Sequence, residues 1–417
     1  MENFLREYRK IPLPATLSMM AILFIRIFLF TQPSFQIDMT VWQAWSARLV
    51  EVGPMNFYDT NIWTNYTPGY LFFLWIIGLL FNGIFNIPFF SSAFIYLIKF
   101  TTTIFDIATA ILIFKILKEY RSKPWPILGL ILYLGNPAII FNTSVWGQID
   151  GILTFFILLS LYLVIEKHKV SFSSAFFAEA FLIKPQTIAI LPLYALIIFQ
   201  RFKKNLIKIA VVVFLIFISY SLLFFPRDIF FGLINLVIKM TKDYSITSLY
   251  AFNTWSILGW WQNDATKWMG FSYALWGFSM YILALALIIT PSLIKQNKDK
   301  FYFYLLYALS IMAFYLFPTR VHERYLLPFF AFFLIAALLK RSRLLILIYI
   351  IVSAINLVNL WFVYYYYNFI YNNPVLRNNI FYSLIEQNYK LLAAVLIFCF
   401  FIILFFYYRL KFYDKKS

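Results

Sequence analysis

The stretch that decides the fold is YFYLLYALSIMAFYLF-PTRVHER-YLLPFFAFFLIAALL, residues 302–339. Two apolar runs, 302–317 and 325–339, flank a charged run from Arg320 to Arg324. We interpret both apolar runs as membrane spans, which puts the charged run at a membrane–water boundary. Ionisable groups there are costly unless they face a partner or a wet cavity, so this run is a functional candidate. A short charged loop that anchors two helix ends is the alternative.

The same apolar pattern recurs along the chain. Of its 417 residues 63% are hydrophobic and only 12% are charged, which excludes a soluble globular protein. Because backbone groups in hydrocarbon must bond within their own segment, an all-α polytopic bundle of about 11–13 spans is predicted. The predicted spans are 15–31, 93–114, 126–141, 150–165, 171–184, 186–200, 208–225, 271–292, 302–317, 325–339, 344–363 and 390–408.

The distribution of basic residues gives the expected orientation. The formal net charge is +18, and its clusters lie at 6–10, 115–123, 167–169, 201–208, 295–300, 340–343 and 409–416. Short basic loops stay on the cytoplasmic side, so this charge sets topology and does not indicate nucleic-acid binding. Both termini are then cytoplasmic, and the first apolar run is an uncleaved helix. Segment 68–85 breaks this parity and is expected to be a re-entrant or interfacial helix, or else a further span.

This topology puts five polar segments on the extracytoplasmic side, with a Tyr- and Asn-rich sixth at 364–388. The five are 32–67, 142–150, 184–185, 226–270 and 318–324. They carry carboxylates, one of the two histidines and most of the tryptophans, so the site is expected on the outer face. The only cysteine, Cys399, allows no intramolecular disulfide. The scattered outer acids predict no metal site.

Asp38 is the candidate catalytic residue. It occurs in FQIDMTVWQAW, residues 35–45, directly after the first span, and residues 44–50 are predicted to form an amphipathic surface helix. A carboxylate fixed at the mouth of a cavity can act as a general base. A helix N-cap is the competing interpretation.

Trp146, Gln148 and Asp150 form the second candidate group, at the outer end of a span. A carboxylate with an amide two residues before it suits the recognition of sugar hydroxyls. A helix cap beside an interfacial tryptophan explains the same residues. Tryptophans of segment 226–270 either stack on a sugar or lie among lipid headgroups.

Lys184, Arg320, His322 and Arg324 are the candidate anion-binding residues, because all four are expected at the outer boundary. Arginine contacts a phosphate in a bidentate manner, and lysine acts as a point charge. Glu323 would then orient an arginine, whereas Lys184 alone would also fit a side chain that snorkels to the interface. Four ionisable residues within the spans are expected to pair between helices: Arg26, Lys99, Asp106 and Glu179.

The order of these motifs resembles the GT-C superfamily of polytopic glycosyltransferases. The motifs that carry the resemblance are Asp38, YTPGY (66–70), NP (136–137), WGQID (146–150), KPQ (184–186) and HERYLLP (322–328). The likeness covers about residues 15–340 and is greatest to enzymes that use lipid-monophosphate sugars, including the mannosyltransferase that adds the first mannose in GPI-anchor assembly. It implies one membrane domain, 1–417, with a catalytic module at 15–340 and additional spans at 341–417.

The resemblance implies an inverting transfer of a hexose, with mannose expected, from a polyprenyl- or dolichyl-phosphate sugar to a glycan, lipid or protein acceptor. Asp38 would be the base, the WGQID residues would line the cavity, and the cations would lie near the donor phosphate. No cofactor or metal is implied. Many relatives carry paired acids in the first loop, whereas Met39 follows Asp38 here, so the acceptor stays open.

Two other functions fit the same residues. A flippase or exporter of lipid-linked glycans would need the cations but no base. An O-antigen-type polymerase or ligase would use a lipid-diphosphate donor. We expect a plasma-membrane protein with its active site on the extracytoplasmic side.

Overall fold

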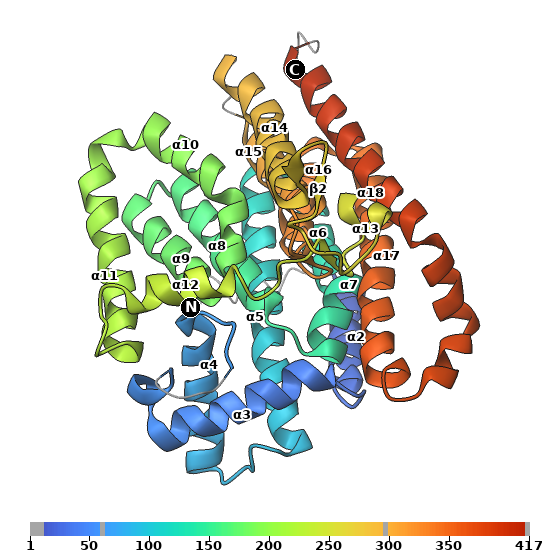
Figure 1. Ribbon diagram of the computed structural model, residues 1–417. Coiled ribbons are helices and arrows are strands. Elements are labelled where there is room, and N and C mark those ends of the chain that lie inside the picture. The colour runs from blue at the N-terminus through green and yellow to red at the C-terminus, as the bar shows by residue number, and fades with distance from the viewer. Residues whose placement is uncertain (1–11, 59–62, 295–298, 413–417) are drawn as a thin grey trace.

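The computed structural model describes residues 12–58, 63–294 and 299–412 as a bundle of helices (Figure 1). Parts of three predicted basic clusters, at 6–10, 295–298 and 415–416, lie outside the described residues. The helices in the segments predicted as spans are α2 (Leu13–Leu29), α5 (Ser92–Tyr120), α6 (Trp125–Leu134), α8 (Asp150–Ile165), α9 (Val170–Ile183), α10 (Leu191–Arg201), α11 (Leu206–Phe224), α14 (Tyr273–Ile294), α15 (Lys300–Leu316), α16 (Leu327–Lys340), α17 (Arg343–Tyr365) and α18 (Ile380–Phe412).

The other α-helices of the described residues are α3 (Gln36–Val52), α4 (Pro68–Gly78), α7 (Pro137–Ile140), α12 (Gly232–Met240) and α13 (Thr254–Leu258). Short π- or 3₁₀-helical segments, such as η3 (Phe141–Trp146) and η4 (Pro185–Ile190), lie between them. Within the described residues, four two-residue strands form two small ladders. β1 (Ser248–Leu249) pairs in parallel with β4 (Val321–His322), and β2 (Lys267–Trp268) pairs antiparallel with β3 (Phe271–Ser272).

Five helices of the described chain are long and apolar enough to cross a membrane. They are Ser92–Tyr120, Lys203–Phe224, Tyr273–Ile294, Arg343–Ile370 and Ile380–Phe412. A sixth span results if the pair Trp125–Leu134 and Pro137–Trp146, bent by 41°, counts as one. Six shorter apolar helices of 10–17 residues accompany them. The prediction of an all-α membrane protein with several spans is therefore confirmed.

Burial separates central helices from lipid-facing ones. Every residue of α16 from Leu327 to Leu339 is buried, as expected for a helix that is apolar on all sides. By contrast, α11 exposes large apolar side chains, including Ile207 at 83%. In a bilayer such exposed apolar surface meets lipid, which removes it from water.

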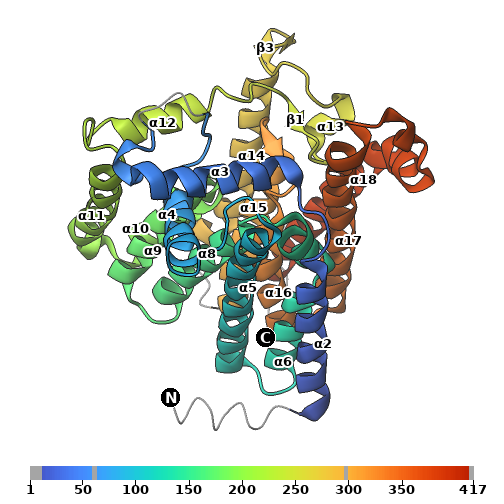
Figure 2. The ribbon, with the colours of Figure 1, turned by 90° about the horizontal axis from the view of Figure 1, so that it is seen from below.

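Several expected element boundaries are wrong. The surface helix predicted at 44–50 is α3, which begins at Gln36 and so includes Asp38. The last helix begins at Ile380, ten residues before the predicted 390. Figure 2 shows α3 and α12 lying across the ends of the other helices, on the side that also holds β1 and α13. We call this the α3 end of the bundle.

Buried charges of the spans are only partly paired between helices. Arg26 Nη1 contacts Asp106 Oδ2 at 2.8 Å, and both side chains are fully buried. Thr143 donates to the same oxygen at 2.8 Å. Lys99 instead donates to the carbonyls of Phe30 and Gln32, so its expected charge pairing is wrong.

Glu179 likewise has no cationic partner among the described residues. It accepts a hydrogen bond of 2.5 Å from the Tyr220 hydroxyl. Two of the four ionisable residues are therefore satisfied by uncharged groups. Backbone carbonyls accept from Lys99, as is common for ionisable groups at membrane depth, and a hydroxyl donates to Glu179.

The Arg26–Asp106 pair predicts a large loss of stability on removing one partner. Arg26→Met leaves a buried carboxylate without its counter-charge, which costs about 3–5 kcal/mol. Denaturant unfolding of the purified protein in detergent measures this loss. Adding Asp106→Asn should recover much of it, whereas Arg377→Met, which breaks the exposed pair with Glu386, should cost little. Equal losses for Arg26→Met and Arg377→Met would contradict the account.

Candidate functional site

Asp38 lies in the first turn of α3 and is held through one of its two oxygens. Trp146 Nε1 donates to Asp38 Oδ2 at 2.9 Å, and Gln148 Nε2 donates to the same oxygen. No hydrogen bond to Asp38 Oδ1 is found within the described residues. The N-cap of α3 is Phe35, so the helix-cap interpretation of Asp38 is wrong.

Gly147 lets Trp146 and Gln148 reach the same carboxylate. Its φ of 93° lies in the left-handed region, where a side chain would be strained, and a Cβ there would lie 2.5 Å from Met39 Cε. Trp146 is fully buried and stacks on Phe35 at 4.3 Å. The turn before α8 is therefore shaped to fix Asp38.

Asp150 and Lys184 form a buried ion pair between α8 and the connection after α9. Lys184 Nζ lies 2.6 Å from Asp150 Oδ1, and Gln186 Nε2 lies 3.5 Å from the same oxygen. Lys184 is therefore paired and does not snorkel. The residue at the N-cap of α8 is Ile149, so the cap interpretation of Asp150 is also wrong.

The two arginines of the charged run at 320–324 make separate sets of contacts. Arg320 is bidentate to Asp264, with Nε–Oδ2 at 2.6 Å and Nη2–Oδ1 at 3.2 Å. Its backbone N–H donates to the Ile246 carbonyl at 3.0 Å, and its φ of 65° is left-handed. Arg320 therefore ties its own turn to the segment that contains Asp264.

Arg324 makes the second contact. Its Nη1 lies 2.8 Å from Glu323 Oε1 and 3.3 Å from His322 Nδ1. Its Nε is buried without a hydrogen-bond partner in the described chain. Glu323 thus orients the guanidinium of Arg324, and the Nε–H of that guanidinium stays available to a ligand.

Two adjoining cavities open at the α3 end of the bundle. The larger, about 530 Å³, is lined by all four predicted anion-binding residues, Lys184, Arg320, His322 and Arg324. Part of its wall is apolar, from residues that include Phe181, Ile188, Val237, Phe278 and Phe314. This combination suits an anionic group that is attached to a hydrocarbon chain.

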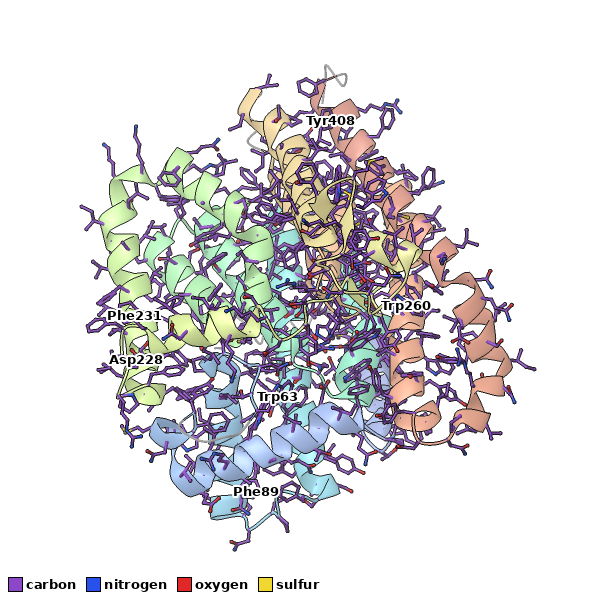
Figure 3. All side chains as sticks on the ribbon, in the orientation of Figure 1. Trp63, Phe89, Asp228, Phe231, Trp260 and Tyr408 are labelled. Atoms are coloured by element: carbon purple, nitrogen blue, oxygen red, sulfur yellow. The ribbon has the colours of Figure 1, made fainter. Side chains whose placement is uncertain are left out.

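The smaller cavity, about 170 Å³, is lined by two carboxylates, Asp38 and Glu323, and by aromatic rings. The rings include Trp42, Trp45, Trp63 (labelled in Figure 3), Trp261 and Tyr367. Both cavities share a wall made of Asn65, Tyr66, Tyr244, His322 and Arg324. The carboxylates and the cations therefore face two compartments with one boundary.

Two of the predicted substrate-binding residues lie behind the cavity walls. Gln148 and Asp150 line neither cavity, and they contact Asp38 and Lys184 instead. Their contacts indicate positioning residues, whereas Trp146 both holds Asp38 and reaches the smaller cavity.

The tryptophans of segment 226–270 differ in whether they pack within the protein or line a cavity. Trp255 Nε1 donates to the Phe317 carbonyl at 2.7 Å, and Trp260 (Figure 3) stacks on Tyr389 at 3.9 Å, so both are structural. Trp261 lines the smaller cavity.

Sequence reasoning missed Asp264 and Tyr244. Asp264 is buried and accepts from Arg320 and Thr319, and Tyr244 forms part of the shared wall. The parallel pairing of β1 with β4 brings their segment against 318–324. The one available signal was that Asp264 is an acid within a predicted outer segment that also contains many aromatic residues.

Comparison of the chain with models of known protein families and with curated protein sequences finds no match. Within the described residues, no three His, Cys, Asp or Glu side chains gather as ligands for a metal ion. The expectation of metal-free chemistry stays a prediction.

Protonation at the charged run follows from burial and from Arg324. Burial, followed by the positive charge of Arg324, lowers the pKa of His322 below its ordinary value of 6.5. For Glu323, burial alone would raise the pKa, but Arg324 and His322 lower it to about 2. At neutral pH Glu323 is therefore ionised and His322 is neutral, with Nε2–H left to donate if Nδ1 accepts from Arg324.

The lowered pKa of His322 predicts that the stability of the protein depends on pH. A folded-state pKa below 6.5 means that the unfolded chain binds the His322 proton more tightly, so stability falls as pH decreases below about 6.5. His322→Gln should remove this part of the dependence, and His168→Gln, a loop control, should keep it. Thermal unfolding at pH 7.5 and 5.5 measures the difference. Identical pH dependences for wild type and His322→Gln would contradict the assignment.

Proposed function

We propose that the protein is an inverting glycosyltransferase of the GT-C type. It would move a hexose, with mannose expected, from a polyprenyl- or dolichyl-phosphate sugar to a hydroxyl acceptor. One observation carries this proposal: Asp38 is anchored through Oδ2, and its Oδ1 has no hydrogen-bond partner among the described residues, on the wall of a cavity that adjoins the basic cavity. That is the geometry needed when a base and a phosphate-binding group act on opposite sides of one reacting carbon.

The larger cavity supports a lipid-phosphate donor. Its cations match a phosphate, and its apolar wall matches the first isoprene units of the lipid. Arg324 lies on the boundary between the cavities and retains a buried Nε without a partner among the described residues. We therefore assign Arg324 to the phosphate oxygen that leaves the sugar. Arg320 and Lys184 keep their carboxylate partners, and the cationic end of each pair lines the cavity.

The smaller cavity supports a sugar or another hydroxyl-bearing acceptor. Its aromatic rings offer flat faces for the C–H groups of a sugar. Of the two carboxylates in its wall, Glu323 is paired with Arg324, and Asp38 can accept a hydroxyl proton. A volume of about 170 Å³ limits the reacting part of the acceptor to roughly one sugar ring.

The reaction is a single displacement. Asp38 Oδ1 takes the proton of the acceptor hydroxyl while that oxygen bonds to the anomeric carbon. The bond between this carbon and the phosphate oxygen breaks, and its electron pair leaves with the lipid phosphate. Arg324, together with Nε2–H of the neutral His322, stabilises the charge that develops there. The transition state resembles an oxocarbenium ion, and the configuration of the anomeric carbon inverts.

The proposal includes the membrane arrangement expected from the sequence. With the basic loops on the cytoplasmic side, both cavities open on the extracytoplasmic side of the plasma membrane. The finer architecture, about 11–13 spans in one GT-C-like domain, belongs to the same proposal.

Removing the proton acceptor should stop the chemistry and leave donor binding intact. Asp38→Asn keeps the hydrogen-bonding shape but loses basicity, so transfer should fall by about 10²–10⁴-fold. The assay follows a labelled polyprenyl-phosphate hexose with purified enzyme and a membrane extract as the source of acceptor. Donor affinity, measured separately by quenching of tryptophan fluorescence, should stay near the wild-type value.

Glu51→Gln is the matched control, because Glu51 lies on the same helix and is exposed. It should keep full activity. Wild-type transfer by Asp38→Asn would overturn the role of Asp38. Labelled donor that crosses a bilayer without losing its sugar, at equal rates in both variants, would favour a flippase instead. Preference for a lipid-diphosphate donor would favour a polymerase or ligase.

A further inference from the structure

Tyr66 places a buried hydroxyl in the wall that the two cavities of the candidate site share. Its ring lines both the larger and the smaller cavity. Its hydroxyl oxygen is buried and has no hydrogen-bond partner among the described residues. Because buried polar groups in proteins are almost always paired, an unpaired hydroxyl in a cavity wall indicates a partner that a ligand supplies.

The position of Tyr66 is fixed by contacts that do not involve this hydroxyl. The Tyr58 hydroxyl donates to the Tyr66 backbone carbonyl at 2.9 Å. The ring packs against those of Trp42, Trp45 and Tyr70, whose centroids lie 6.5, 5.6 and 5.6 Å away. Packing therefore holds the ring in the shared wall, and the hydroxyl adds no hydrogen bond to it.

The charged groups that act on the Tyr66 hydroxyl belong to the candidate site. Burial raises the pKa of Tyr66 above its ordinary value of 10.0, so the hydroxyl is protonated at neutral pH. Among the nearby charges, Arg324 has the largest effect on this pKa and lowers it, followed by Asp38 and Asp150, which raise it. Tyr66 is therefore a hydrogen-bond donor with Arg324 as its main charged neighbour.

Tyr66 and Arg324 together present two unpaired donors at one wall. Arg324 Nε is buried and also has no hydrogen-bond partner within the described chain. A guanidinium N–H can only donate, so both groups are satisfied together by an acceptor. A phosphate offers several acceptor oxygens, and hydrogen bonds to such a charged group are roughly twice as strong as those to a neutral one.

The hydroxyl of Tyr66 is covered by protein, although its ring faces the cavities. A ligand reaches the hydroxyl when the ring turns or when a neighbouring side chain moves. Either movement gains a hydrogen bond and breaks none at the hydroxyl, which is costly to leave unpaired where water cannot reach it. A local rearrangement of the shared wall on ligand binding is therefore favoured.

We propose that Tyr66 is a further residue that binds the donor phosphate. Its hydroxyl donates to one phosphate oxygen, beside the oxygen that Arg324 binds. This inference rests on the proposed lipid-phosphate donor, and it puts the phosphate at the boundary between the two cavities. Negative charge on the phosphate grows as the sugar leaves, so this hydrogen bond strengthens in the transition state.

Binding of farnesyl phosphate, a short prenyl phosphate that carries no sugar, tests the proposal. Tyr66→Phe removes only the hydroxyl and should weaken this binding about tenfold, the equivalent of about 1.4 kcal/mol. Isothermal titration calorimetry of the intact protein in detergent measures the affinity. Farnesol lacks the phosphate and should bind equally to the wild type and to the variant.

Tyr70→Phe is the matched control. Tyr70 also has a buried hydroxyl without a hydrogen-bond partner in the described chain, but it is not among the residues that line either cavity. This variant should keep the wild-type affinity for farnesyl phosphate. Both substitutions remove an unpaired buried hydroxyl, so neither should lower the thermal midpoint of the protein without ligand. Loss of affinity without loss of stability separates a ligand contact from a structural role.

Equal farnesyl phosphate affinities of the wild type and Tyr66→Phe would overturn this inference and leave the proposed donor standing. A lower thermal midpoint for Tyr66→Phe, with Tyr70→Phe unchanged, would overturn it as well, because the hydroxyl would then have a partner within the protein. If the wild-type protein bound no farnesyl phosphate, the inference and the proposed donor would fail together.

Discussion

The hydrogen bonds from Trp146 and Gln148 to one oxygen of Asp38 join α3 to the turn before α8. A carboxylate that leaves water needs donors, and here a single turn around Gly147 supplies two of them. The same turn leads directly to Asp150, which holds Lys184. One local turn therefore sets the positions of both the candidate base and one wall of the basic cavity.

Pairing of charges explains why several cations can share one cavity. Lys184, Arg320 and Arg324 would repel one another if they were unpaired, but Asp150, Asp264 and Glu323 each hold one of them. The three carboxylates come from different parts of the chain, and all three pairs are present in the protein alone, so the cavity is preorganised before any ligand binds. Preorganised charge is worth more in a partly dry site, because no solvent has to rearrange during the reaction.

The sequence allowed the helices to be predicted well, because long apolar runs leave few alternatives to a membrane helix. The predicted topology alone also put Asp38, Lys184, His322 and Arg324 on one side of the membrane, and these residues line the two adjoining cavities. The sequence did not allow the tertiary contacts to be predicted. Nothing in the apolar pattern indicates that β1 pairs with β4, and this pairing brings Asp264 and Tyr244 to the site.

The errors have a common physical origin. Lys99 was expected to pair with a carboxylate, but carbonyls at the end of α2 lie within reach and satisfy it. Asp150 was compatible with a helix cap because its partner, Lys184, lies 34 residues away. Sequence spacing reports which residues share a helix face, and it does not report which distant group meets a buried charge.

The central claim is that Asp38 and the basic cavity cooperate in breaking one bond and forming another. The most direct measurement is a single-turnover reaction with a donor labelled at the anomeric carbon, analysed by NMR and by mass spectrometry of the released lipid. The account predicts one free lipid phosphate for each sugar transferred, and a product of inverted anomeric configuration. Retention of configuration, or sugar that never leaves its lipid, would contradict it.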